Sequence, residues 1–321
     1  MKNKRILTVI FAAAAAVSFL TSCDSPDSSS ENSTLAGDTL ENVYDPYAEE
    51  NGYDIPDSYF EERSGVDYGT MDYDVTYYSS TAGDDKKCNV LLPAGYDKNK
   101  SYPVMYIYHG FGGSYSDQLY NGSYLNLLYG NMLADGLAEP QIIVNVDMYT
   151  DKQEDKDSMS DEELRYSYDK VIDDVANDLM PFIEKNYSVK KGRENTAIAG
   201  MSEGGAKSLC TGFKWLDKFG YIAAFAPDEN VIPIGDDYMD SFWTVPYFKD
   251  GFPKPEKDNM PYYVYMTVGS YDPWNVDATL FYHDTLDDMD VKNQTDKVDG
   301  FGHNYIFWRQ CFYNFLKKTF H

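Results

Sequence analysis

The stretch TAIAGMSEGGAKSLCTGF occupies residues 196–213 of a chain of 321 residues. Its first four residues form a short apolar run typical of a buried strand, and Ala206–Phe213 has the apolar spacing of a helix. Between them, Gly200 and Gly204 flank Ser202 and permit a turn that is too tight for bulky side chains. A strand that enters a helix through such a turn is typical of an α/β sheet.

Strand-like and helix-like segments alternate on both sides of this stretch. Apolar runs typical of strands occur at residues 73–79, 87–92, 102–108, 141–146, 221–225 and 262–268. Helical spacing occurs over residues 117–133, 163–187, 275–289 and 305–318. Because alternating strands and helices build parallel sheets covered on both faces, the predicted fold class is α/β with a mainly parallel sheet. One globular domain is expected over residues 66–321.

The N-terminal part of the chain has the composition of a targeting segment and a tether. A basic start precedes an apolar run from Ile6 to Leu20, and Leu20-Thr21-Ser22-Cys23 resembles a lipobox. We expect residues 1–22 to be a lipoprotein signal peptide and Cys23 to carry lipid; an ordinary secretory signal is the other interpretation. Residues 23–65 are acidic, Ser-rich and without apolar periodicity, which predicts a disordered tether. The expected location is the bacterial cell surface or envelope, with membrane contact only through the lipid anchor.

The charge of the chain limits its possible partners, and its cysteine content limits the disulfides and metal sites that it could form. The chain has 53 acidic and 27 basic residues and a formal net charge of −26, so nucleic acid is excluded as a partner. Cys88, Cys210 and Cys311 remain if Cys23 is lipidated, and we expect small buried thiols rather than a disulfide framework. No pair of cysteines has the spacing of metal ligands, so the sequence predicts neither a metal site nor a cofactor.

Ser202 is the predicted nucleophile. It lies within Gly200-Met201-Ser202-Glu203-Gly204, the Gly-x-Ser-x-Gly pattern of a turn that exposes a serine hydroxyl above the sheet. A serine hydroxyl reacts poorly at neutral pH unless a base removes its proton, so a histidine and an orienting acid must follow in the chain.

The base and the acid are predicted from their positions after the serine. His303 follows Gly302 on a loop that enters the last helix, whereas the second candidate, His283, falls within the helical pattern of residues 275–289. Asp272 comes directly after the strand at residues 262–268 and is the predicted acid, with Asp277 as the second candidate. A buried carboxylate there would orient the imidazole and stabilise the imidazolium.

Backbone amides are expected to stabilise the oxyanion of the tetrahedral intermediate. One is the amide of Glu203, which follows the nucleophile. The other comes from the glycine-rich stretch His109–Gly113; Phe111 is the predicted donor, with Gly112 as the second candidate.

Several motifs together give the chain a family resemblance. They are Leu92-Pro93-Ala94-Gly95-Tyr96, Tyr102-Pro103-Val104-Met105-Tyr106 with the following His109-Gly110, Ala197–Ser202, Lys218-Phe219-Gly220-Tyr221, Gly302-His303 and Trp308–Leu316. With these motifs the region from about Tyr73 to Phe320 resembles the α/β-hydrolase esterases of the first carbohydrate esterase family, related to esterase D and the bacterial feruloyl esterases.

The resemblance implies a Ser-His-Asp esterase that removes feruloyl or acetyl groups from plant cell-wall polysaccharide such as xylan, through an acyl-enzyme. An acylated polysaccharide or oligosaccharide is the implied substrate. Two other hypotheses remain: an acyltransferase on the same scaffold, and a non-catalytic carbohydrate-binding protein that keeps the fold.

Two features depart from the family pattern. Glu203 stands where these enzymes often carry an uncharged residue; its carboxylate either interacts with the helix dipole or points into the pocket. The segment Tyr238–Phe252 is an aromatic insertion, interpreted either as a substrate wall or as core packing. Gly112, Trp243 and Trp274 are the predicted substrate-binding residues.

Overall fold

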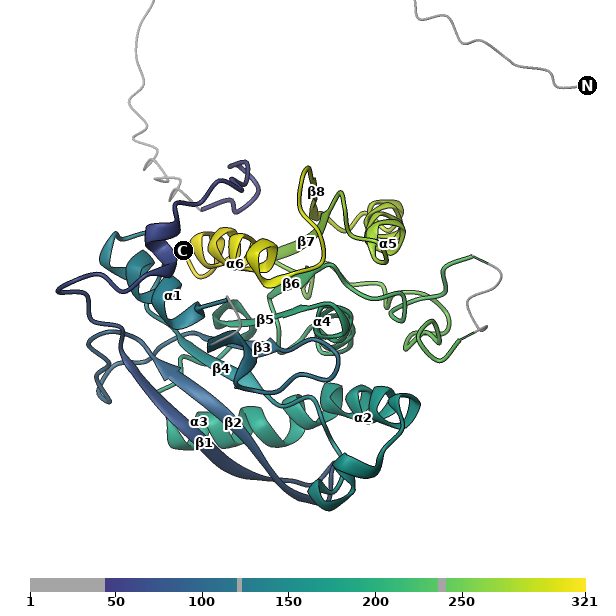
Figure 1. Ribbon diagram of the computed structural model, residues 1–321, viewed down its shortest axis with the longest axis horizontal. Coiled ribbons are helices and arrows are strands. Elements are labelled where there is room, and N and C mark those ends of the chain that lie inside the picture. Colours follow the sequence, from purple (N-terminus) through teal and green to yellow (C-terminus); the bar gives the residue numbers. More distant parts are fainter. Residues whose placement is uncertain (1–43, 120–122, 236–240) are drawn as a thin grey trace, which may run out of the picture. The chain divides into compact units, whose positions relative to one another are not determined.

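The computed structural model of the chain describes residues 44–119, 123–235 and 241–321 (Figure 1). Cys23 and the signal peptide expected over residues 1–22 lie outside the described residues, so both stay predictions. Within the described residues, no helix combines the length and the apolarity that crossing a bilayer requires.

A single eight-stranded sheet forms the centre of the domain, with the strand order β1-β2-β4-β3-β5-β6-β7-β8. β1 and β2 are antiparallel to their neighbours, whereas β3 to β8 run parallel, so the sheet is mainly parallel as expected. The strands are β1 (Thr70–Ser79), β2 (Asp84–Leu92), β3 (Val104–Tyr108), β4 (Ile142–Val146), β5 (Thr196–Met201), β6 (Tyr221–Phe225), β7 (Tyr263–Gly269) and β8 (Gln294–Val298).

Helices cover both faces of the sheet (Figure 1). One face packs against α1 and α6, and the other packs against α2, α3, α4 and α5. The helices are α1 (Leu125–Ala134), α2 (Asp161–Asp174), α3 (Met180–Asn186), α4 (Glu203–Lys214), α5 (Val276–Asp288) and α6 (Tyr305–Lys318). The central strands read as almost continuous apolar runs because both of their sides are buried.

The structure differs from the sequence prediction at three elements. β8 was not predicted, because Gln294–Val298 is a half-exposed edge strand with a polar sequence. The helix expected over residues 117–133 begins only at Leu125, after Tyr124 adopts a left-handed φ of 46°. The helix expected over residues 163–187 consists of α2, a π-helical turn at Val175–Leu179 and α3.

Residues 44–65 correct the predicted tether, because they pack against the domain. The Tyr47 hydroxyl accepts a hydrogen bond from Val264 N at 2.9 Å, and Tyr53 bonds to the hydroxyl of Tyr265 at 2.7 Å. Ile55 N donates to the side chain of Gln310 at 3.0 Å. The apolar residues of this segment are not spaced with the period of a helix or a strand. Composition alone therefore assigned the segment to the tether.

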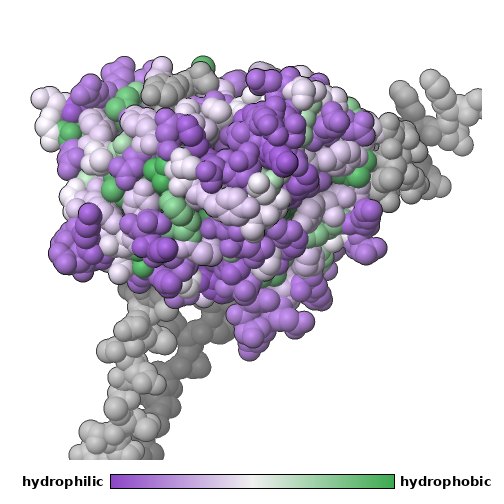
Figure 2. Space-filling model, turned by 90° about the horizontal axis from the view of Figure 1, so that it is seen from below, coloured by the Kyte–Doolittle hydropathy of each residue, from purple (hydrophilic) through white to green (hydrophobic). Residues whose placement is uncertain are grey.

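The cysteines agree with the expectation of small buried thiols. Cys88, Cys210 and Cys311 are buried, free thiols. Figure 2 shows one face of the molecule, on which hydrophilic residues predominate and hydrophobic residues lie in small groups.

Candidate active site

Ser202 lies in a strained turn between β5 and α4, as its sequence pattern predicts. Its φ is 55°, a left-handed value that is uncommon for a residue with a side chain, and its amide donates to Phe225 O at 2.8 Å. A Cβ atom on Gly200 would lie 2.2 Å from Gly204 O, and one on Gly204 would lie 2.2 Å from His109 O. Both glycines are therefore required by the close approach of backbone to backbone.

Replacing Gly204 with Ala should both destabilise the domain and disturb the serine. The added methyl group meets backbone atoms that cannot rotate away, so we expect a loss of about 2–3 kcal/mol in the free energy of unfolding. Urea unfolding and the rate of fluorophosphonate labelling measure the two effects. Gly52→Ala is the matched control, because a Cβ there meets no atom within 4 Å. Equal stability of the two variants would contradict the steric requirement at Gly204.

The structure brings the three predicted side chains together in one chain of hydrogen bonds. Ser202 Oγ lies 3.0 Å from His303 Nε2, and His303 Nδ1 lies 2.7 Å from Asp272 Oδ2. Of the second candidates, Asp277 is exposed on the first turn of α5, and His283 bonds to Asn293 instead. Neither is part of this arrangement.

Asp272 is held as a carboxylate beside the imidazole. Its Oδ1 accepts hydrogen bonds from the amides of Trp274 and Asn275, at 3.0 Å and 3.1 Å. Burial alone would raise its pKa, but the hydrogen bond and charge of His303, together with these amides, hold the pKa of Asp272 below its usual value. The rings of Trp274 and Trp308 meet the imidazole edge-on from 5.3 Å and 5.0 Å. The imidazole is therefore fixed in orientation.

The acid loop and the histidine loop are joined by backbone contacts. Tyr271 N donates to Phe301 O at 2.8 Å, and Ser270 N donates to Val298 O at 2.8 Å. A Cβ on Gly269, the last residue of β7, would lie 2.3 Å from Phe301 O. This close packing brings Asp272 and His303 together although they are far apart in the sequence.

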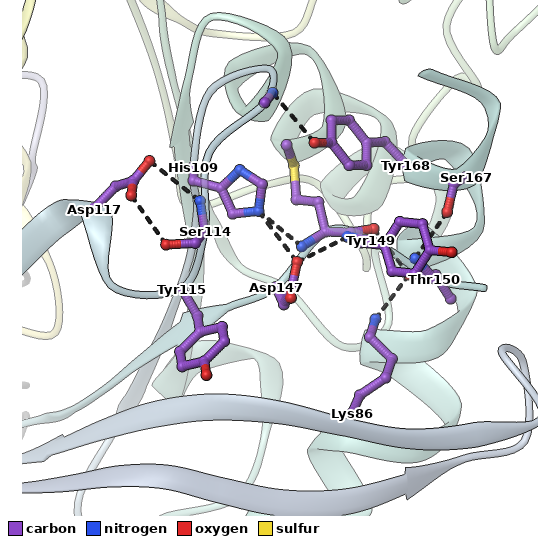
Figure 3. Close-up of polar contacts among 12 residues, drawn as sticks. Lys86, His109, Ser114, Tyr115, Asp117, Asp147, Tyr149, Thr150, Ser167 and Tyr168 are labelled. Carbon is purple, nitrogen blue, oxygen red and sulfur yellow. Dashed lines mark hydrogen bonds and ion pairs between the residues drawn. The ribbon is translucent and has the colours of Figure 1, made fainter. Parts of the chain in front are cut away.

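His109 shapes the glycine-rich loop next to Ser202 (Figure 3). Met148 N donates to His109 Nε2 at 3.0 Å, so Nδ1 carries the proton and donates to Gly110 O at 2.7 Å. Gly113 N donates to the same carbonyl oxygen at 3.1 Å. The loop is thereby folded into a fixed turn, and Gly110 lies against the Cβ of Ser202.

The two amides considered for the oxyanion site differ in their partners. Gly112 N donates to the hydroxyl of Tyr168 at 3.2 Å (Figure 3). Within the described ranges, the amides of Phe111 and Glu203 have no hydrogen-bond acceptor. Gly112 does not line the pocket, so its predicted contact with substrate is not supported by its position.

A pocket of about 720 Å³ opens above Ser202 and His303. Phe111, Trp243 and Trp274 supply its aromatic walls. The ring of Trp243 meets that of Phe111 edge-on at 4.6 Å, and Trp274 stands at the mouth with 66% of its surface exposed. Trp243 and Trp274 thus lie where the sequence predicted substrate contacts.

The aromatic insertion lines the pocket in one part and packs against the core in another. Trp243 and Thr244 line the pocket, whereas Tyr247, Phe248 and Phe252 pack against the core. Residues 236–240, at the start of the insertion, lie outside the described residues.

Glu203 points neither into the pocket nor into solvent. Its side chain is fully buried behind the serine, 3.1 Å from Lys207 Nζ and 3.6 Å from Arg165 Nε. Asn230 Nδ2 donates to its Oε2 at 2.6 Å. The interpretation in which its carboxylate faces the substrate is therefore wrong, because buried cations bind it at the start of α4.

Asp228 is the pocket residue that sequence reasoning missed. It follows the end of β6, and its Oδ1 lies 3.3 Å from Ser202 Oγ. A signal was available, since residues after the carboxyl ends of neighbouring parallel strands meet at one edge of the sheet. The abundance of aspartates in this chain obscured that signal. In the part of the chain that the structure describes, no group of three or more His, Cys, Asp or Glu side chains is arranged to hold a metal ion.

The sheet, the strained serine turn and the Ser-His-Asp arrangement define the α/β-hydrolase class. Residues 79–281 match the model of the esterase family described as "Putative esterase". The chain belongs to this family and is a serine esterase similar to those of the first carbohydrate esterase family.

Relatives with known names cover most of the chain. A CE1 ferulic acid esterase from Anaeromyces mucronatus, solved with ferulic acid, is 30% identical; the alignment covers 84% of this chain and 98% of that one, with a TM-score of 0.72. An endo-1,4-beta-xylanase/feruloyl esterase of Xylanibacter ruminicola is 26% identical over 84% of this chain. This chain spans only 34% of that relative's length. An acetyl esterase of Caldicellulosiruptor saccharolyticus is 23% identical, with 67% of this chain and 82% of the relative covered.

Proposed function

We propose that this esterase removes feruloyl groups from plant cell-wall polysaccharide such as xylan, through an acyl-enzyme. The observation that carries the proposal is the aromatic pocket above Ser202, walled by Phe111 and Trp243. Aromatic faces bind a phenolic ring by offset or edge-to-face contact, which an acetyl group cannot exploit. A pocket of about 720 Å³ also exceeds what an acetyl group fills.

Each step of the proposed reaction is assigned to a residue of the site. Ser202 Oγ attacks the ester carbonyl while His303 Nε2 takes its proton, and the sugar alcohol leaves with that proton. Water then attacks the carbonyl of the acyl-enzyme while His303 Nε2 takes its proton, and Ser202 Oγ leaves with that proton as the acid is released. The amides of Phe111 and Glu203 are the proposed oxyanion donors, because Gly112 N already donates to Tyr168.

The sugar side of the substrate is assigned to the mouth of the pocket. Trp274 presents an exposed ring beside His303, where the leaving alcohol must collect its proton. Flat aromatic surfaces of this kind stack on sugar rings. The named relatives support a feruloylated polysaccharide as the substrate, since they include an endo-1,4-beta-xylanase/feruloyl esterase and a ferulic acid esterase.

A panel of esters tests the choice between feruloyl and acetyl groups. We expect the wild type to hydrolyse methyl ferulate with a kcat/KM at least about tenfold above that for p-nitrophenyl acetate, corrected for leaving-group reactivity, and to release little acetate from acetylated xylan. Trp243→Ala should lower kcat/KM for methyl ferulate by about 10- to 100-fold, mainly through KM. The same variant should change turnover of p-nitrophenyl acetate by less than about threefold.

Phe248→Ala is the matched control, because Phe248 belongs to the same insertion but packs against the core. Phe248→Ala should change kcat/KM by about the same factor for all of the esters. Preference for acetylated xylan, or an equal loss for both esters in Trp243→Ala, would refute the feruloyl assignment. Transfer of feruloyl to an added sugar acceptor in place of water would favour the acyltransferase hypothesis instead.

A further inference from the structure

The carboxyl group of Asp228 competes with His303 for the hydroxyl of Ser202. Asp228 Oδ1 lies 3.3 Å from Ser202 Oγ, and His303 Nε2 lies 3.0 Å from the same oxygen. Asn275 Nδ2 fixes the carboxyl by donating to its Oδ1 at 2.8 Å. Because a serine hydroxyl has one proton, only one of its two neighbours can accept it at a time.

Asp228 borders a buried cluster of charges that is balanced without it. Arg165 and Lys207 are the two cations of this cluster, and Asp169 and Glu203 are its two anions. Among the described residues, no Lys, Arg or His forms an ion pair with Asp228. An ionised Asp228 would therefore add a third negative charge that no cation compensates.

The surroundings of Asp228 favour its protonated form, because its carboxyl group lies beside the negative charge of Glu203 and pairs with none of the cations in the described residues. Desolvation and the negative charge of Glu203 raise the pKa of Asp228 well above its usual value, against the lowering effect of Asn275 and Ser202. Since Glu203 is already bound by two cations, the proton belongs on Asp228.

The charged and titratable groups around Asp228 come from five parts of the fold. They are Glu203 and Lys207 of α4, Arg165 and Asp169 of α2, the adjacent Glu229, Asp277 and Tyr282 of α5, and His303 before α6. Glu229 lines the pocket, and burial and Asp277 raise its pKa; as a carboxyl group it supplies no positive charge to Asp228 in either protonation state.

We propose that Asp228 is a positioning residue whose neutral carboxyl group leaves the Ser202 proton to His303, and whose ionised form withdraws that proton and stops the attack. In its neutral form, the carboxyl group presents only a weak, uncharged acceptor to the hydroxyl of Ser202. Loss of this proton to solvent base makes Oδ1 a strong, charged acceptor. The new charge also lies beside the developing oxyanion, which it repels.

Esterase activity should therefore fall at alkaline pH, where Asp228 loses its proton. The pH of this fall depends on both Asp228 and Glu203, because the two carboxyl groups interact. This inference rests on the proposed role of Ser202 as the nucleophile. It goes beyond that role because it assigns regulation by pH to a residue outside the Ser-His-Asp arrangement.

The test measures kcat/KM and the rate of fluorophosphonate labelling from about pH 5 to about pH 10. We expect the wild type to lose at least about tenfold on the alkaline side. Asp228→Asn keeps the shape and the neutral charge, so its loss should stay below about twofold. Glu203→Gln removes the charge that favours protonated Asp228, so its loss should begin at a lower pH than in the wild type.

Asp217→Asn is the matched control, because Asp217 is exposed beyond the far end of α4. Its profile should follow that of the wild type. An unchanged alkaline loss in Asp228→Asn, or a shift to higher pH in Glu203→Gln, would overturn the proposal. If circular dichroism shows that Asp228→Asn does not fold, the direction of the shift in Glu203→Gln decides. The outcome is separate from the tests of the proposed function: the ester panel decides the feruloyl assignment, and a Ser202→Ala variant that is labelled and active like the wild type would refute the role of Ser202.

Discussion

Replacing Ser202 with Ala is expected to lower kcat/KM for methyl ferulate by at least about a thousandfold, and by a factor on the order of 10⁵ if attack by Ser202 is the only route. The variant loses the atom that forms the acyl-enzyme, while the pocket and the oxyanion amides remain. Residual hydrolysis would come from water positioned by those groups. Steady-state kinetics and fluorophosphonate labelling measure the loss.

A matched substitution separates the loss of the nucleophile from any effect that replacing a serine with alanine has elsewhere in the chain. Ser101 is exposed on the loop between β2 and β3, and Ser101→Ala should keep kcat/KM within about twofold of the wild type. Comparable turnover by Ser202→Ala and the wild type would remove Ser202 from the mechanism. A folded wild type that is never labelled would favour the non-catalytic hypothesis.

The sequence predicted the parts of the site whose residue types are demanded by local geometry. Gly200 and Gly204 are required because backbone atoms lie too close to leave room for a side chain. The turn around Ser202 can therefore be recognised from the amino-acid sequence alone. Asp272 could be placed because it follows a strand with a clear apolar pattern, and His303 because it precedes a helix with one. The strands of the buried sheet were predictable for the same reason.

What the sequence could not predict depends on partners that are distant in the chain. Glu203 is buried by Arg165 and Lys207, and nothing in its local sequence indicates that Arg165 of α2 packs against the start of α4. The hydroxyl of Tyr168, on α2, accepts from the amide of Gly112 and so favours the predicted Phe111 as the oxyanion donor, and the local sequence does not indicate this contact. β8 escaped prediction because an edge strand needs little apolar surface.

Replacing Asp272 with Asn is expected to lower kcat/KM by a factor on the order of 10³ to 10⁴. The Asn amide can donate a hydrogen bond to His303 Nδ1. The imidazole then has its lone pair on Nδ1 and its proton on Nε2. An Nε2 that already holds a proton cannot accept that of Ser202. The amides of Trp274 and Asn275 still find an oxygen at residue 272, so the loop should keep its shape. Kinetics with methyl ferulate measure the loss, and labelling should slow in parallel.

The pH dependence of stability distinguishes this tautomer effect from a collapsed loop. Because the pKa of Asp272 lies below its usual value in the folded state, its ionised form stabilises the fold above the unfolded pKa of about 3.9. That contribution is lost as the pH falls through the lower, folded pKa. The difference in free energy of unfolding between wild type and Asp272→Asn should therefore be largest near neutral pH and shrink in acid. A difference that is constant with pH would mean that Asn distorts the loop, and the kinetic loss would then say nothing about the tautomer of His303.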